Sequence, residues 1–249
     1  MSEPRKCLWQ YTLIHHLWTD FRTRWRFKFT LPKVREAVLE GVRLGIAALS
    51  PIMKNNILEG RYEVQERTLA QEYLKPSDAV LEVGGAIGFI GLFCQVQLGI
   101  TQYTTVEANP NTVELLKKNY AINGRTPSVW NVALAAADGE VTLNIGTEFW
   151  ENSLVTGANS GKSVRVPACS LTTLVQRLAY VPTALIIDIE GAEQFVDFAQ
   201  VPASVKKIIM ELHPAFIGYP KTHRIIADLV NLGFRVEREL AGTYLFLRD

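Results

Sequence analysis

Short apolar runs alternate with amphipathic segments over most of the chain beyond residue 78. The runs have the length of strands, and the segments between them repeat their apolar residues with helical spacing. The predicted strands cover residues 79–83, 103–107, 128–132, 184–189 and 207–212, and the predicted helices begin near residues 88, 109 and 223. This alternation predicts an α/β fold in which a parallel-rich, doubly wound sheet carries helices on both faces.

Two further pairs of runs predict antiparallel strands. Residues 234–239 and 244–247 are joined by an Ala-Gly turn and predict a hairpin that closes the sheet. Residues 140–145 and 164–167 predict an extra strand pair on either side of a segment rich in Gly, Asn and Ser, residues 146–163. Because this long segment contains a Phe and a Trp, we interpret it as a lid.

The N-terminal region shows a different pattern. Residues 33–50 carry an apolar stripe at intervals of three to four residues, which predicts a helix that ends at Pro51. A second helix is predicted over residues 62–74. We therefore interpret residues 1–76 as a helical extension or cap, packed on a domain that covers residues 77–249.

Composition is ordinary for a globular protein: 249 residues, 48% hydrophobic and 20% charged, with a formal net charge of +1. The basic charge is concentrated in residues 1–35, which hold eight Lys or Arg against two acidic residues. Residues 25–29 alternate aromatic and basic side chains. We interpret them as a cap whose aromatic rings pack on the domain, with a membrane-surface contact or a lid as alternatives.

Three widely spaced cysteines share no metal-binding spacing. Cys94 and Cys169 have apolar neighbours, which predicts buried thiols in a reducing compartment. The first apolar stretch is interrupted by Gln10, His15 and His16, which disfavours a signal peptide, and no apolar run reaches about 18 residues. We expect a cytoplasmic protein.

The most informative motif is the sequence VLEVGGAIGF at residues 80–89. A strand runs into a glycine-rich turn and then a helix, so a ligand can approach the main chain. The acid within the strand, Glu82, disfavours phosphate and suits an ammonium group. The next strand ends at Glu107, which suits a ribose diol. S-adenosylmethionine (SAM) combines an ammonium, a sulfonium and a ribose without phosphate, so the motif favours SAM over NAD.

Polar residues follow most of the predicted strands, where an open α/β sheet binds its ligands. These residues are Glu82, Gly84, Glu107, Asn131, Asp188, Glu190, Glu211 and His213. Each has a structural alternative: Glu82 bonding loop amides, Glu107 capping a helix, Asn131 holding its own turn, Glu190 starting a helix and His213 packing. Asp188 follows a fully apolar strand, which favours a functional role.

Several segments together resemble the FkbM-type family of SAM-dependent methyltransferases. The resemblance covers about residues 60–240 and is most specific in the DIEGAE sequence that begins at Asp188. The matching segments are residues 62–63, 80–91, 131–134, 166–175, 188–193 and 210–214. The resemblance implies a class I methyltransferase sheet, Rossmann-like with an antiparallel last strand, and O-methylation of hydroxyls on sugars, glycans or polyketide-type natural products.

The resemblance also implies roles for individual residues. Glu82, Gly84, Gly85 and Gly88 would line the methionine end of SAM, and Glu107 would bind the ribose. Ala108, Asn109, Asn131 and Ala133 would lie beside the adenine. Asp188, Glu190 and His213 would face the transferred methyl group and the acceptor.

Two departures from the family pattern stand out. The glycine turn commonly begins with Asp and has Asn before its last Gly, where this chain has Glu82 and Ile87. A segment that commonly carries two acids reads SLTTL at residues 170–174 and has none. The resemblance says nothing about residues 1–55.

Methyl transfer to an alcohol needs positioning and a base, because alcohols are weak acids. His213 and Asp188 are the candidate bases. A Mg²⁺ ion held by Asp188, Glu190 and Glu211 is the second, less favoured possibility, and our primary expectation includes no metal.

Three other functions compete with this prediction. An N-methyltransferase or nucleic-acid methyltransferase lacks support, because the Asn/Asp-Pro-Pro-Tyr signature is absent and strand-end acids repel phosphate. A non-catalytic SAM-binding partner is disfavoured by the intact strand-end acids, and an NAD-linked dehydrogenase by the glycine turn. We expect a small-molecule or glycan acceptor and no nucleic acid; the sequence leaves the oligomeric state open.

Overall fold

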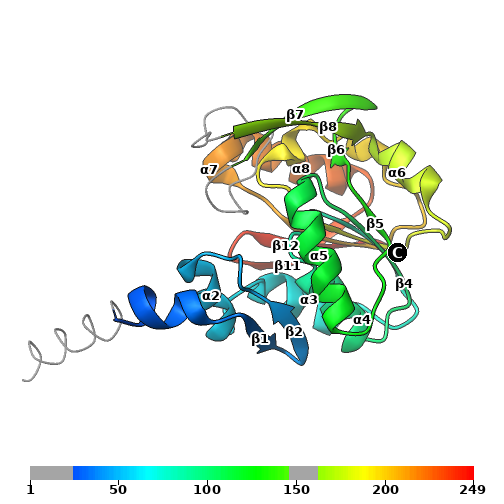
Figure 1. Cartoon of the computed structure of the whole chain (residues 1–249). Coiled ribbons are helices and arrows are strands. Elements are labelled where there is room, and N and C mark those ends of the chain that lie inside the picture. Colours follow the sequence, from blue (N-terminus) through cyan, green and yellow to red (C-terminus); the bar gives the residue numbers. More distant parts are fainter. Residues whose placement is uncertain (1–24, 146–161) are drawn as a thin grey trace, which may run out of the picture.

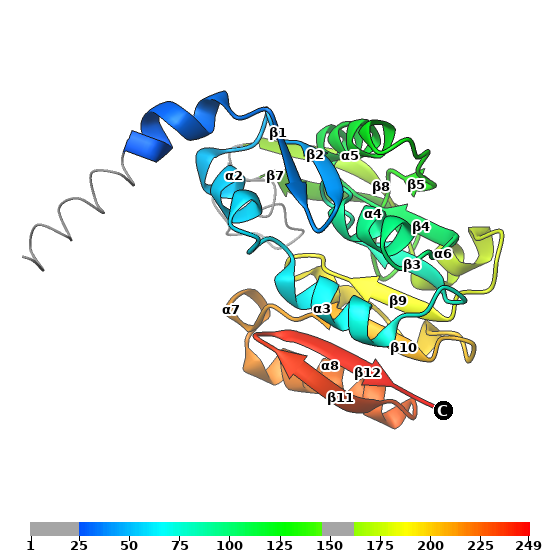
Figure 2. The ribbon, with the colours of Figure 1, turned by 90° about the horizontal axis from the view of Figure 1, so that it is seen from below.

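The computed structural model describes residues 25–145 and 162–249, and a seven-stranded sheet forms its centre (Figure 1). The strands lie in the order β11-β12-β10-β9-β3-β4-β5, which Figure 2 shows from below. Their bounds are β3 (Ala79–Val83), β4 (Gln102–Val106), β5 (Val129–Trp130), β9 (Ala184–Ile187), β10 (Lys207–Glu211), β11 (Arg235–Leu240) and β12 (Thr243–Leu247).

Five neighbouring strands, from β5 to β10, run parallel, whereas β12 is antiparallel to both β10 and β11. Strand β12 is therefore inserted between two strands that precede it in the chain. This order, with its single reversed strand, is that of the class I methyltransferase fold. The predicted fold class and the closing hairpin are confirmed.

Helices cover both faces of the sheet because successive strand residues point to opposite sides. Val80 lies in one core with α3 (Val64–Tyr73), α4 (Phe89–Val96) and α5 (Pro110–Ile122). Its neighbour Leu81 lies in the other core. That second core includes α6 (Leu171–Arg177), α7 (Pro214–Ile217) and α8 (Tyr219–Asn231).

A small second sheet follows β5, with the strand order β6-β8-β7. Its members are β6 (Ala133–Leu134), β7 (Gly139–Ile145) and β8 (Lys162–Cys169). The antiparallel pairing of β7 and β8 confirms the predicted extra strand pair. Residues 146–161, most of the predicted lid, lie outside the described residues, so the lid stays a prediction.

The helix predicted over residues 33–50 is wrong. The structure has a hairpin there, β1 (Glu36–Leu39) and β2 (Val42–Gly45), joined through Glu40 and Gly41. Both turn residues have positive φ, 47° and 74°, as a two-residue hairpin turn requires. The buried positions alternate through both strands, whereas Val38, a member of the supposed helical stripe, is 68% exposed.

Pro51 begins a helix instead of ending one. Helix α2 (Pro51–Leu58) has Pro51 at its first position, where the missing N–H is no loss. The Ser50 hydroxyl accepts a hydrogen bond from the Met53 N–H at 3.2 Å and caps the helix. The N-terminal extension is thus a hairpin with helices rather than the helical unit expected. Residues 1–24 of the extension lie outside the described residues.

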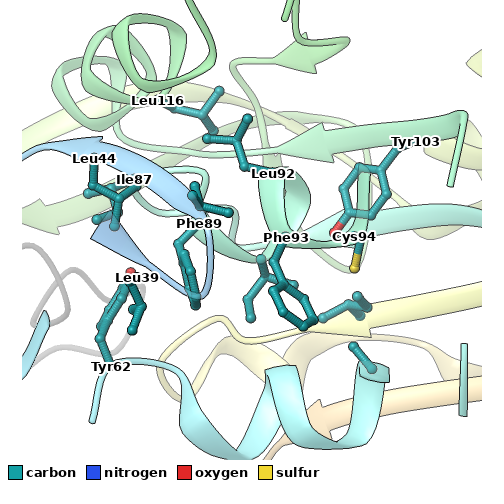
Figure 3. Packing of buried hydrophobic residues seen from close by; sticks show 14 of the residues in the cluster. Leu39, Leu44, Tyr62, Ile87, Phe89, Leu92, Phe93, Cys94, Tyr103 and Leu116 are labelled. Atoms are coloured by element: carbon teal, nitrogen blue, oxygen red, sulfur yellow. The ribbon is translucent and has the colours of Figure 1, made fainter. Parts of the chain in front are cut away.

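The hairpin and the segment after α2 share a core with the sheet. Figure 3 shows Leu39, Leu44 and Tyr62 in one cluster with Ile87 and Phe89, and the rings of Tyr62 and Phe89 lie 5.7 Å apart. The cluster contains residues from both sides of the predicted boundary at residue 77. The described part of the extension therefore shares its hydrophobic core with the domain. The domain boundary itself stays a prediction.

The described part of the basic-aromatic segment is partly exposed. Trp25 is 54% exposed and Phe29 is 43% exposed, and their rings contact each other, 4.5 Å apart. About half of each residue is thus exposed, and both the packing of this segment on the domain and the membrane-surface contact stay predictions. No helix within residues 25–145 and 162–249 is long and apolar enough to span a membrane. Cys94 and Cys169 are buried free thiols, as expected.

Candidate functional site

A cavity of about 350 Å³ lies at the carboxyl ends of β3, β4, β9 and β10. Its walls come from the glycine turn after β3, the loops after β4, β5 and β9, and the N-terminal extension. This is where an open α/β sheet binds ligands. About half of the residues singled out in the sequence line this cavity, in two groups: one around the glycine turn and the end of β4, the other at the ends of β9 and β10.

The glycine turn forms one wall and is packed too closely for side chains. Gly84 has a φ of 92°, and a Cβ added there would lie 1.6 Å from the main-chain oxygen of Asp188. A Cβ on Gly85 would lie 1.9 Å from Thr105 Cγ2. The N–H groups of Gly84 and Gly85 both donate to the Val106 carbonyl, at 2.8 and 3.2 Å. Gly84 borders the cavity, so the close packing keeps the main chain bare there.

The other two predicted glycines lie further from the cavity. Gly88 precedes α4, and a Cβ there would lie 2.8 Å from Leu116 Cγ. It does not line the main cavity, and Gly85 borders only a small adjoining cavity of about 10 Å³. Both glycines therefore shape the turn rather than offer a direct contact to a ligand in the main cavity.

Glu82 points away from the main cavity. Its side chain is 3% exposed, and its Oε2 accepts a hydrogen bond of 2.6 Å from the Thr105 hydroxyl. Burial raises the pKa of Glu82 to about 7, although the hydrogen bonds counteract part of this rise. Glu82 borders the small adjoining cavity, so the structure places it beneath the turn instead of facing the predicted ammonium directly.

Glu107 lines the cavity and links the glycine turn to the loop after β4 by hydrogen bonds. One carboxylate oxygen accepts the Ala86 N–H at 3.0 Å and the other accepts the Asn109 N–H at 2.7 Å. The cap of α5 is Asn109, whose Oδ1 accepts the Asn111 N–H at 3.0 Å. Burial raises the pKa of Glu107 to about 7, against these hydrogen bonds. Each carboxylate oxygen keeps a lone pair for a ligand hydroxyl.

Beyond Glu107 the cavity wall is apolar. Ala108 and Ala133 line it, together with Val132, Leu134 and Leu143. Two other predicted contacts, Asn109 and Asn131, do not line the cavity. The Asn131 amide donates to the carbonyls of Glu107 and Ala108, at 2.8 and 2.9 Å, and so fixes the loop. Asn131 therefore has a structural position, although it holds the loop after β4 and not its own turn as the alternative stated.

Where β9 and β10 end, carboxylates gather around His213. The imidazole Nε2 lies 3.2 Å from Glu190 Oε2, 3.7 Å from Asp188 Oδ1 and 3.8 Å from Glu211 Oε1. Its Nδ1 lies 3.0 Å from Glu193 Oε1. Asp188, Glu190 and Glu211 line the cavity, whereas His213 lies behind them. The three residues expected at the chemical end, Asp188, Glu190 and His213, are thus brought together, with Glu211 beside them.

The pKa values reflect this crowding. Burial, followed by the charges of Glu190 and Glu211, raises the pKa of Asp188 well above its usual range. Burial also raises the pKa of Glu190 to about 7. Burial alone would lower the pKa of His213, but the hydrogen bond and charge of Glu193, with the other acids, raise it to about 9. The surrounding acids thus favour the protonated form of the imidazole.

Sequence reasoning assigned no site role to several residues that build this end. Glu63 and Glu66 line the cavity from the extension, and the Thr243 hydroxyl donates to Glu66 Oε1 at 2.6 Å. Glu63 belongs to a segment that matches the family, residues 62–63, whereas no local motif marks Glu66. Glu193, which is fully buried against His213, does belong to the DIEGAE sequence, so that signal was available.

Backbone strain is concentrated around the cavity. Five described non-glycine residues have a positive φ, and three of them line the cavity: Glu63 at 49°, Ala86 at 44° and Glu190 at 51°. Such conformations cost about 1–3 kcal/mol each and persist where the surroundings impose them. Their position supports a functional role for this cavity.

Comparisons with known proteins find similar solved structures but name no family. No family model and no curated protein matches the chain. Among solved structures, methyltransferase FkbM from Methylobacillus flagellatus KT is similar, with 13% identity and a TM-score of 0.46. The match covers 79% of this chain and 53% of that chain, so this chain spans about half the length of that protein.

Two further solved structures are similar at the same level. A precorrin-6y C5,15-methyltransferase from Geobacter metallireducens GS-15 has 12% identity and a TM-score of 0.46, over 74% of this chain and 87% of its own. A putative transferase from Pyrococcus horikoshii has 14% identity and a TM-score of 0.44, and the match covers 86% of this chain and 71% of that chain. These likenesses are too weak to carry a conclusion, and the class I methyltransferase fold rests on the strand order.

Proposed function

We propose that the protein is a SAM-dependent O-methyltransferase acting on a hydroxyl of a sugar, glycan or polyketide-type natural product. The observation that carries the proposal is the cavity at the carboxyl ends of a class I methyltransferase sheet, whose described lining holds six carboxylates and one guanidinium. Such a lining attracts a cationic donor and repels a phosphate-bearing dinucleotide. The hydroxyl acceptor rests on the resemblance of residues 60–240 to the FkbM-type family.

The residues around the glycine turn fit SAM. Gly84 and Ala86 leave main chain open to the cavity, and Glu107 offers two carboxylate oxygens to ribose hydroxyls. Ala108 and Ala133 offer apolar surface for an adenine. When bound, SAM supplies a methyl group activated by a positively charged sulfonium.

In the proposed reaction, the bond between sulfur and the methyl carbon breaks while a bond between the acceptor oxygen and that carbon forms. The sulfonium becomes a neutral thioether, and the hydroxyl proton passes to a carboxylate of the protein. Asp188 and Glu190 are the candidates, because both line the cavity. His213 lies behind them and holds the cluster in place. General-base assistance of this kind contributes about 10²–10⁴-fold to the rate.

A second candidate is N-methylation of an amine. The excess of carboxylates at the His213 end favours it, since an ammonium-bearing acceptor would be attracted there. Turnover on a matched panel of alcohols and amines distinguishes the two. A nucleic-acid acceptor is disfavoured by the same carboxylates, which repel a phosphate backbone.

The first test is a thermal-shift comparison of SAM, S-adenosylhomocysteine and NAD. We expect the first two to stabilise the fold by about 2.7 kcal/mol at a hundredfold excess over the dissociation constant, and NAD to have no effect. The absence of a shift with millimolar SAM would refute the proposal. Stabilisation by SAM without turnover on any acceptor would instead favour a non-catalytic SAM-binding protein.

A further inference from the structure

Three potential metal ligands converge at the His213 end of the cavity. Asp188 Oδ1, Glu211 Oε1 and His213 Nε2 all lie within 4.8 Å of one another. The imidazole nitrogen is 3.7 Å from the Asp188 oxygen and 3.8 Å from the Glu211 oxygen. These distances exceed a hydrogen bond. Two ligands of one ion at about 2.1 Å lie about 3.0–4.2 Å apart, depending on the angle at the ion.

The orientation of His213 is imposed from behind. The Glu193 side chain is fully buried, and its Oε1 lies 3.0 Å from His213 Nδ1. The same oxygen accepts the Gly191 N–H at 3.2 Å, so Glu193 is itself held by the main chain. A carboxylate on one imidazole nitrogen, with the other nitrogen turned toward further ligands, is the usual support of a metal-binding histidine.

Asp188 supplies a second observation. None of the described residues forms a hydrogen bond with its Oδ1, although that atom is buried. A buried polar atom without a partner costs about 1–3 kcal/mol, more when it is charged. The Asp188 N–H donates to the Val83 carbonyl at 2.9 Å, which anchors the residue at the mouth of β9. This oxygen is also the one that lies 3.7 Å from His213 Nε2.

We propose that Asp188, Glu211 and His213 form a binding site for a divalent cation of the Mn²⁺ type. Two carboxylate oxygens suit Mg²⁺ or Mn²⁺, and an imidazole nitrogen suits transition metals, so Mn²⁺ satisfies the whole set. The sequence had suggested Glu190 as a ligand in place of His213. Three protein ligands leave coordination positions open toward the cavity, since Asp188 and Glu211 both line it.

The proposal deepens the methyl transfer proposed above and rests on it for its chemical purpose, although ion binding itself needs no donor. A doubly charged ion beside the acceptor would lower the pKa of the acceptor hydroxyl. Glu190 lines the same cavity and is not one of the three ligands, so it is left to take the hydroxyl proton.

The test uses the full chain without SAM, titrated with Mn²⁺ and followed by electron paramagnetic resonance of the free ion. We expect one saturable site. Asp188→Asn and His213→Ala should weaken binding at least tenfold, and Glu193→Gln by about 10–100-fold, the range for a residue that orients a ligand. Glu114→Gln, an exposed acid on α5, is the matched control and should bind as the wild type does.

A measurement on the wild-type protein tests the proposal even if a variant fails to fold. Pulsed electron paramagnetic resonance of bound Mn²⁺ should detect coupling to an imidazole nitrogen, and its absence would overturn the proposal. A wild type without saturable binding would also overturn it. That result would leave His213 as an imidazolium that neutralises the acids, as its 3.2 Å contact with Glu190 allows.

Calorimetric titration with SAM, on the same samples, separates the two proposals. SAM binding without a Mn²⁺ site would overturn the metal proposal only. A Mn²⁺ site without SAM binding would support the metal proposal and overturn the methyltransferase assignment.

Discussion

The two ends of the cavity differ in how their polar groups are satisfied. At the donor end, around the glycine turn, Glu107 bonds two main-chain N–H groups and Gly84 donates to the Val106 carbonyl. At the acceptor end, around His213, four carboxylates surround one imidazole, and a buried oxygen of Asp188 lacks a described hydrogen-bond partner. The polar groups of the donor end thus satisfy one another. The acceptor end instead has an excess of carboxylates, whose negative charge a cation would balance.

The two ends also differ in the segments of the chain that build them. The donor end is made by the turn after β3 together with the segments after β4 and β5, which supply Glu107, Ala108 and Ala133. The acceptor end draws on β9, β10 and the N-terminal extension, which supplies Glu63 and Glu66. We expect substitutions at the donor end to affect folding and donor affinity, and those at the acceptor end to affect turnover.

The largest expected effect is that of Gly84→Ala. The new Cβ would lie 1.6 Å from the Asp188 main-chain oxygen, at a φ of 92° that disfavours side chains. We expect unfolding to become easier by about 4 kcal/mol or more, as measured by chemical denaturation. Gly99→Ala is the control, since φ is also positive at 71° but no described atom lies within 4 Å of the added Cβ. Its cost should be about 1 kcal/mol. Equal costs would show that the turn is not tightly packed.

Glu82→Gln tests whether burial of this acid costs stability. Its pKa in the fold is about 7 and its ordinary value is 4.5, so the folded state retains a proton that the unfolded state releases between these values. The free energy of unfolding therefore falls as pH rises through this window. At pH 8 the variant should be more stable than the wild type by up to about 3 kcal/mol. At pH 4.5 or below this advantage should vanish. An advantage independent of pH would contradict the argument.

Glu107→Ala should weaken SAM binding by about 1.5–3 kcal/mol in calorimetry, the value of a hydrogen bond to a charged group. Burial raises the pKa of Glu107 to about 7, and ribose hydroxyls donate best to the ionised form. The affinity of the wild type for SAM should therefore fall as pH drops below 7, and Glu107→Gln should lose this dependence. Unchanged affinity for SAM in Glu107→Ala would show that Glu107 does not contact the ribose. Its role would then be limited to its hydrogen bonds with the turn and the loop.

Asp188→Asn should slow turnover at least tenfold, which corresponds to about 1.4 kcal/mol. The loss should appear in kcat, whereas the affinity for SAM should be retained. His213→Ala should act in the same direction. Asp228→Asn, an exposed acid on α8, is the control for both. Full activity of His213→Ala on the true acceptor would reduce His213 to a packing residue and remove the distinction between the two ends.

The sequence by itself determined the elements with strong local signals. β3 begins and ends where the apolar run predicted, at Ala79 and Val83, and α5 begins at Pro110, next to the predicted start near residue 109. The hairpin of β11 and β12 was also predicted, because a turn sequence between two apolar runs is local information. The strand-end residues Glu107, Asp188, Glu190 and His213 were found by one rule, that parallel strands present their carboxyl ends at the same edge.

Tertiary structure decided what local spacing leaves ambiguous. In residues 33–50 the apolar spacing fits a helix, but Ala37, Leu39, Val42 and Leu44 are buried on one face of a hairpin against α4 and α5. The contacts of Glu66 with Thr243 and of Glu193 with His213 join residues 177 and 20 positions apart. Contacts of that range depend on how the chain folds back on itself, which no short stretch of sequence encodes.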